Sequence, residues 1–137
     1  MKELAQMLRN ARGFNCGGKA DVRDNIDARR YLKEANLALL PDEFFSLVKY
    51  VNGVKGDFGE LYAIDPSGQS GFTDAVRANE SLRLPDGENA AVLGENTFDY
   101  LVYDTTTQKY QLRDREDGEI MGDYGELSAA VKGLLRL

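Results

Sequence analysis

The sequence predicts an α+β domain whose central, mostly antiparallel sheet is packed by N-terminal and C-terminal helices. Apolar residues recur at helical spacing in the first third of the chain and again at its end. Between these regions lie short runs of aromatic and β-branched residues, bounded by glycine and polar residues, as expected for strands. Runs of strands beside runs of helices are typical of α+β folds. The 137 residues suit one domain, residues 1–137.

Two helices are predicted near the N-terminus. The first covers residues 2–12, where Leu4, Met7, Leu8 and Ala11 form an apolar stripe. The second covers residues 27–35, with Tyr31 and Leu32 facing inward. The glycine-rich residues 13–18 interrupt the pattern, and we predict a glycine-rich joint between the two helices there.

The third predicted helix is the most completely specified segment of the chain. Pro41 suits its first position, where no backbone N–H is needed. Asp42 and Glu43 then lie at the positive end of the helix dipole. One apolar stripe is formed by Phe44, Leu47, Val48 and Val51. Asn52 and Gly53 supply a left-handed end.

The rest of the chain is predicted to be mainly strands. These strands are residues 60–65, 90–93 (ending at Gly94), 99–104, 110–113 and 120–121. Residues 105–108 suggest a hairpin loop, and Asp117 with Gly118 suggests a turn. A helix is predicted over residues 72–82. The C-terminal helix is predicted from the spacing of Leu127, Val131, Leu134 and Leu135.

The inventory of reactive residues excludes several kinds of site. The chain contains no histidine, which removes the commonest general base and metal ligand and excludes Ser-His-Asp and Cys-His arrangements. A single cysteine, Cys16, cannot build a zinc site of the usual kind. Lys19 offers this thiol only weak electrostatic activation, so an ordinary unreactive thiol is expected. We therefore expect no metal site and no catalytic site built on histidine or cysteine.

The sequence also indicates a compartment. One cysteine excludes an internal disulfide, so a reducing cytoplasm is the expected location. No apolar run approaches the roughly 20 residues that span a bilayer. The first residues lack the apolar block of a secretory signal. We expect no membrane partner.

One segment imitates a nucleotide-binding motif. Residues 13–20 match the phosphate-binding loop pattern G-x-x-x-x-G-K-[ST] at every position except the last, where Ala20 lacks the hydroxyl that binds magnesium. Asp104 could imitate the acidic magnesium ligand. A phosphate-binding loop needs a preceding strand and a helix that starts at the lysine, whereas a helix is predicted before Gly13. Nucleotide binding is therefore disfavoured.

Charge is distributed unevenly along the chain. The net charge is −6, but residues 1–35 carry +3 and the remainder carries −9. An acidic body penalises nucleic acid and favours basic partners. The alternative interpretation is that this charge serves only solubility.

The acidic residues are densest near the C-terminus. They are Asp114, Glu116, Asp117, Glu119, Asp123 and Glu126. Only Arg113 and Arg115 offset them, and the spacing of a calcium loop is missing. The segment is either a solvated acidic edge or a patch that docks a basic protein. For the second case we predict a partner-binding surface of Asp114, Glu116, Asp117, Glu119 and Tyr124; tyrosines, although often half-buried, are favoured interface anchors.

An ordered set of residues resembles the SUKH superfamily, which includes the Smi/Knr cell-wall-assembly regulators and many bacterial toxin-immunity proteins. The set begins at residues 40–53 and continues with Leu61, Tyr62, Asn79, residues 92–94, residues 99–104 and Tyr124. Within it we assign structural motif roles to Leu40, Pro41, Phe44, Asn52, Gly53, Leu61, Tyr62, Gly94 and Asp104. The chain departs from the family in having no tryptophan. Residues 1–24 form an extra N-terminal element without a match.

The resemblance implies an α+β domain without catalysis or cofactor that binds another protein. It implies backbone roles for Gly53 and Gly94, and core roles for Leu40, Phe44, Tyr62 and Leu101. The expected function is that of an immunity protein that neutralises a toxin, often a nuclease, by stoichiometric binding. A basic toxin domain would suit the acidic chain. The alternatives are a regulatory or scaffolding domain with an endogenous partner and, more remotely, a nucleotide-binding enzyme.

Overall fold

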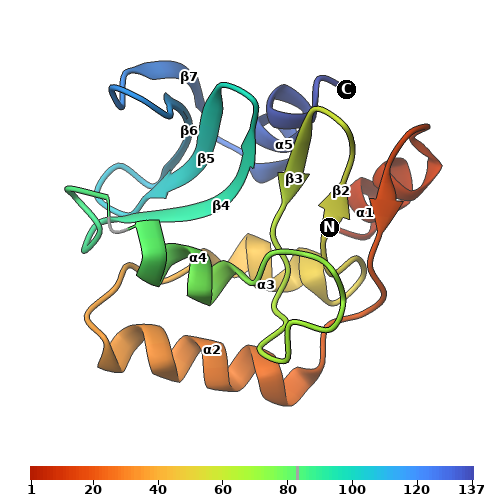
Figure 1. Ribbon diagram of the computed structural model, residues 1–137, viewed down its shortest axis with the longest axis horizontal. Coiled ribbons are helices and arrows are strands. Elements are labelled where there is room, and N and C mark those ends of the chain that lie inside the picture. Colours follow the sequence, from red (N-terminus) through yellow and green to blue (C-terminus); the bar gives the residue numbers. More distant parts are fainter. Residues whose placement is uncertain (83) are drawn as a thin grey trace.

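The computed structural model describes residues 1–82 and 84–137. Within them the chain forms five helices and one antiparallel sheet of seven strands, which confirms the predicted α+β class (Figure 1). The strands are β1 (Asn15–Cys16), β2 (Val54–Lys55), β3 (Gly59–Leu61), β4 (Ala90–Asn96), β5 (Asp99–Asp104), β6 (Lys109–Asp114) and β7 (Ile120–Tyr124). The helices are α1 (Lys2–Asn10), α2 (Val22–Glu34), α3 (Asp42–Val48), α4 (Ala75–Leu82) and α5 (Leu127–Leu135).

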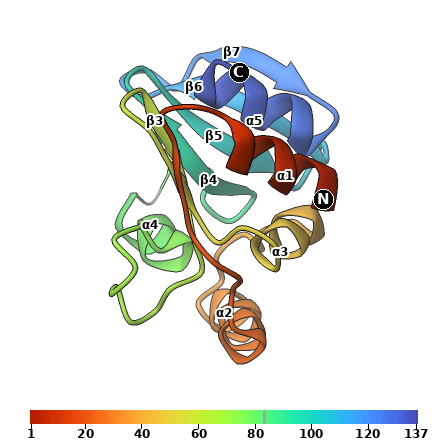
Figure 2. The ribbon, with the colours of Figure 1, turned by 90° about the vertical axis from the view of Figure 1, so that its right-hand side faces the viewer.

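The sheet is a meander in which each strand pairs with the next one in sequence. Helix α5 crosses β3 to β7 on one face, with α1 on the same side, whereas α4 contacts β4 from the other side (Figure 2). Helix α2 lies at the opposite end of the molecule from β7. No helix in the described ranges is long and apolar enough to cross a membrane.

One hydrophobic core joins the helices to the sheet. The residues predicted to serve this core are all buried: Leu40, Phe44, Tyr62 and Leu101. Leu4 and Leu8 of α1 belong to the same buried cluster as Leu134 of α5. The extra N-terminal element therefore contributes directly to the packing of the fold.

Helix α3 is shorter than its apolar stripe predicts. Pro41 is its N-cap with extended backbone (φ −69°, ψ 155°), not its first helical residue, and the helix ends at Val48. Beyond this end, the side-chain amide of Asn52 donates to Ile64 O (3.0 Å) and accepts from Ile64 N (2.8 Å). Asn52 thus bonds to the segment after β3 instead of continuing the helix. Gly53 has φ of 100°, as predicted for a left-handed position.

The first two helices also differ from their predicted bounds. Helix α1 ends at Asn10 because Ala11 turns to extended backbone (φ −72°, ψ 132°). Helix α2 begins at Val22 rather than at residue 27. The cause is an N-cap that the sequence analysis missed: Asp21 Oδ1 accepts backbone N–H groups two and three residues later, at 2.8 and 3.2 Å.

The predicted glycine-rich joint does connect α1 and α2, and it also contains a short strand that the sequence pattern did not indicate. Strand β1 pairs with β2, with Asn15 opposite Lys55. The Gly17 N–H donates to Gly53 O at 2.8 Å. A Cβ on Gly17 would lie 2.0 Å from Asn52 O, so only glycine allows the two segments to come this close.

Several predicted strands have different ends. The β3 ladder stops at Leu61 rather than at residue 65, whereas β7 continues past residue 121 to Tyr124. Gly94 does not end β4 but lies inside it, at a register shift against β5. A Cβ on Gly94 would lie 2.5 Å from Glu60 O and 2.9 Å from Leu134 Cδ2. Glycine is therefore required where β3 and α5 both pack closely on β4.

Candidate functional site

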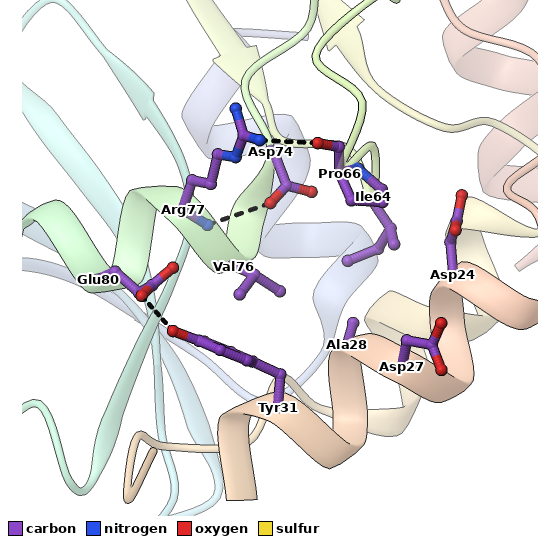
Figure 3. Close-up of a pocket in the computed structure, with 10 residues that line it drawn as sticks. All are labelled: Asp24, Asp27, Ala28, Tyr31, Ile64, Pro66, Asp74, Val76, Arg77 and Glu80. Atoms are coloured by element: carbon purple, nitrogen blue, oxygen red, sulfur yellow. Dashed lines mark hydrogen bonds between the residues drawn. The ribbon is translucent and has the colours of Figure 1, made fainter. Parts of the chain in front are cut away.

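A pocket of about 340 Å³ with a mainly apolar lining lies between α2 and α4 (Figure 3). Its lining residues are Asp24, Asp27, Ala28, Tyr31, Ile64, Pro66, Asp74, Val76, Arg77 and Glu80. Helix α2 supplies the first four, the segment after β3 supplies the next two, and α4 with its preceding residue supplies the others. The pocket therefore joins three parts of the chain that are remote in sequence.

Helical spacing places the side chains of α2 in the pocket. Asp24, Asp27, Ala28 and Tyr31 follow one another at i, i+3, i+4 and i+7, so they share one face of the helix. The hydroxyl of Tyr31 donates to the carboxylate of Glu80 on α4. This hydrogen bond links the two helices at one end of the pocket (Figure 3).

Asp74 fixes the start of α4. Its Oδ2 accepts from Arg77 N (3.1 Å) and its Oδ1 accepts from Asp65 N (2.7 Å). This cap explains why α4 begins at Ala75 rather than at residue 72, the predicted start. The guanidinium of Arg77 donates to Pro66 O at 2.8 Å and so ties α4 to the segment after β3.

The floor of the pocket is apolar and its rim is acidic. Ala28 and Ile64 are buried beneath it, and the Val76 side chain points into it (Figure 3). Around this floor, the described lining residues contribute four carboxylates and one guanidinium. Partial burial is the main cause that raises the pKa of Asp24. The nearby carboxylates raise it further; they belong to Asp21, Asp27, Asp65 and Asp74. The site therefore favours a cationic group with an apolar stem.

One of the carboxylates that line the pocket is already occupied by backbone contacts. Both oxygens of the Asp74 carboxylate already accept backbone N–H groups. In residues 1–82 and 84–137, no group of three or more cysteine, aspartate and glutamate side chains is placed to hold a metal ion.

The predicted partner-binding residues form a separate surface on the β6–β7 hairpin. Asp114 ends β6, and Glu116, Asp117 and Glu119 are exposed around the turn. The Asp114 carboxylate accepts from Glu116 N (2.8 Å) and Asp117 N (3.1 Å), and these backbone N–H groups lower its pKa. Asp117 Oδ1 accepts from Glu119 N (2.8 Å). Two of the four acidic side chains therefore hold the turn together.

Tyr124 does not join the acidic turn. Its half-buried ring lies against α5, where a Cβ on Gly133 would be 2.6 Å from the Tyr124 hydroxyl oxygen. Asp104, predicted as a structural residue, accepts from Thr106 N (2.9 Å) at the end of β5 and lies 3.6 Å from Arg113 Nη2. The hairpin contributes none of the ten residues that line the α2–α4 pocket.

The segment that imitates a phosphate-binding loop forms backbone hydrogen bonds with the segment after α3. Gly17 N–H donates to Gly53 O, and Gly18 O accepts from Asn52 N at 2.7 Å. The carboxylate of Asp21 occupies the N-terminus of the following helix, where a phosphate would bind. This geometry does not favour nucleotide binding.

The pocket was not indicated by the sequence patterns. Tyr31 and Leu32 were both predicted to face inward; Leu32 is buried, but Tyr31 is 44% exposed at the mouth of the pocket. The spacing of Asp24, Asp27 and Tyr31 on one helical face was a usable signal. That α4 lies opposite this face depends on tertiary packing, which the sequence pattern does not reveal.

No model of a known protein family matches the sequence, and a comparison with curated proteins finds no match.

Proposed function

We propose that this chain is a non-enzymatic protein-binding module of the SUKH type, which acts in the cytoplasm as an immunity protein. It would neutralise a basic bacterial toxin domain by stoichiometric binding. The observation that carries the proposal is the acidic, apolar-floored pocket between α2 and α4 on a chain of net charge −6. Such a site offers a basic partner both charge complementarity and apolar area, which is how protein interfaces gain rate and affinity.

The residues that carry the SUKH resemblance support the proposal through their structural roles. Phe44 and Tyr62 fill the core, Gly94 allows close packing, and Asn52 and Asn79 hold neighbouring segments through their side-chain amides. These roles leave the surface available for partner recognition.

Coexpression with toxins tests the proposal. The chain is produced together with each toxin domain encoded beside its gene, and growth and complex formation are measured. We expect one toxin to be neutralised and to copurify at a one-to-one ratio. Failure to relieve the toxicity of every neighbouring toxin would contradict the immunity function. A stable complex with an endogenous enzyme instead would favour the regulatory alternative.

A further inference from the structure

We propose that the α2–α4 pocket is an anchor site for one arginine side chain of a protein partner. This inference rests on the proposed function in that it identifies how the same acidic site recognises a basic toxin. The ligand class is an alkyl guanidinium presented by a protein surface.

The size of the pocket suits one long side chain. Its volume of about 340 Å³ is near the lower limit of small-molecule sites, which span roughly 300–1,000 Å³. Helix α2 and helix α4 stand on opposite sides, and their Tyr31–Glu80 hydrogen bond closes one end (Figure 3). A partner helix laid along this surface would not enter, whereas a single extended side chain would.

The distribution of polarity matches the two parts of an arginine side chain. Ala28, Ile64 and Val76 provide an apolar floor for the methylene stem. Asp24 and Asp27 of α2 provide carboxylates for the charged head, whereas the Glu80 carboxylate accepts the Tyr31 hydroxyl. A neutral or anionic group would not neutralise the Asp24 and Asp27 carboxylates.

Arginine fits this arrangement better than lysine. Its guanidinium directs five N–H donors within one plane, so it can bond to the neighbouring Asp24 and Asp27 carboxylates together. It is more weakly hydrated than an ammonium group and stacks on aromatic faces such as that of Tyr31. A lysine ammonium is a compact point charge that lacks these two advantages.

Titration with small probes tests the pocket without any toxin. The methyl resonances of Ile64 and Val76 are followed by NMR while N-acetyl-arginine amide, N-acetyl-lysine amide or N-acetyl-citrulline amide is added. We expect saturable shifts with arginine amide, with a Kd on the order of 1 mM. Citrulline, its neutral isostere, should bind at least about tenfold more weakly, and lysine should bind more weakly than arginine.

Matched double variants separate the pocket from general charge. Asp24→Asn with Asp27→Asn should abolish the arginine-induced shifts, whereas Glu116→Gln with Glu119→Gln on the hairpin, which removes the same charge, should preserve them. Circular dichroism verifies that both variants are folded. The proposal would be overturned if arginine amide caused no saturable shifts, or if citrulline amide or lysine amide caused equal shifts. It would also be overturned if the two double variants lost the arginine-induced shifts equally.

The outcomes for the pocket and for the immunity function are distinguishable. If arginine amide binds but the chain relieves the toxicity of no toxin, the anchor site stands and the immunity function is overturned. If the chain relieves toxicity but arginine amide does not bind, the immunity function stands and the anchor site is overturned.

Discussion

Asn79 of α4 pairs with both backbone hydrogen-bonding groups of Val92 in β4. Its Nδ2 donates to Val92 O at 2.9 Å, and its Oδ1 accepts from Val92 N at 2.7 Å. The same Nδ2 donates to Ala75 O at 2.8 Å. The contact lies beside the register shift between Val92 and Gly94, and the side chain of Asn79 is buried. One side chain therefore fixes the helix that forms a wall of the α2–α4 pocket.

Replacing Asn79 by alanine should destabilise the fold by about 2–4 kcal/mol, because the N–H and C=O of Val92 lose their partner in a buried environment. Urea denaturation measures this change. Asn10→Ala, at the exposed end of α1, is the matched control and should change the free energy of unfolding by less than about 0.5 kcal/mol. An effect of Asn79→Ala no larger than that of the control would contradict the role assigned to this amide.

Gly94→Ala tests the close packing of β4. The new Cβ would meet Glu60 O at 2.5 Å and Leu134 Cδ2 at 2.9 Å, so we expect a loss of about 1–3 kcal/mol. Gly125→Ala is the control, because its Cβ would meet nothing within 4 Å and the glycine lacks a positive φ. Thermal unfolding compares the two variants. Equal melting temperatures would show that β3 and α5 move apart without cost.

Local patterns predicted the helix and hairpin content, because apolar spacing and turn residues act within a few positions. The third helix shows both the strength and the limit of such patterns. Its stripe from Phe44 to Val48 is helical and buried. The pattern extends to Val51, yet the helix stops at Val48 because Asn52 bonds to Ile64, a partner that local spacing does not indicate.

The candidate site was less accessible to sequence reasoning than the fold. The high density of acidic residues along the sequence predicted a binding surface on the β6–β7 hairpin. There, the Asp114 carboxylate instead accepts backbone N–H groups of the turn. The pocket instead combines the widely spaced Asp24 and Asp27 with Glu80, which lies opposite them only after α2 and α4 pack. Charge density along a chain does not measure charge density in space.

Asp114 should make a pH-dependent contribution to stability. Backbone N–H groups of Asp117 and Glu116 hold its pKa below the usual value, so its contribution is present above the unfolded pKa of about 3.9. That contribution is lost as the pH falls through the lower, folded-state pKa. The stability difference between the native chain and Asp114→Ala should shrink between pH 6 and pH 2 in urea titrations. Glu116→Ala serves as the control; if its difference shrank equally, the turn contacts of Asp114 would not be the cause.

Cys16 should react slowly with thiol reagents. Partial burial raises the pKa of the thiol, although Arg9 partly opposes this effect, and the Sγ donates to Leu8 O at 3.6 Å. Because the thiolate is the reactive form, we expect the native chain to react with a disulfide reagent at pH 7.5 at least about tenfold more slowly than the urea-unfolded chain. Equal rates in the two states would instead identify an exposed, activated thiol.

Tyr62 and Tyr110 should resist ionisation while the chain stays folded. Burial is the main cause that raises the pKa of each phenol, and the hydrogen bonds from Tyr62 to Glu95 (3.0 Å) and from Tyr110 to Glu43 (2.7 Å) add to it. The neutral form is thus favoured in the folded state. Stability should be fully present below the unfolded pKa of about 10 and should decline as the pH rises above it.

A spectrophotometric titration measures this resistance directly. Of the seven tyrosines, two should ionise only together with unfolding. The double variant Tyr62→Phe with Tyr110→Phe should be less stable at pH 7 by about 1 kcal/mol for each lost hydrogen bond, but its stability should fall less steeply above pH 10. Ionisation of all seven phenols before the fold is lost would show that neither hydroxyl is held by its glutamate.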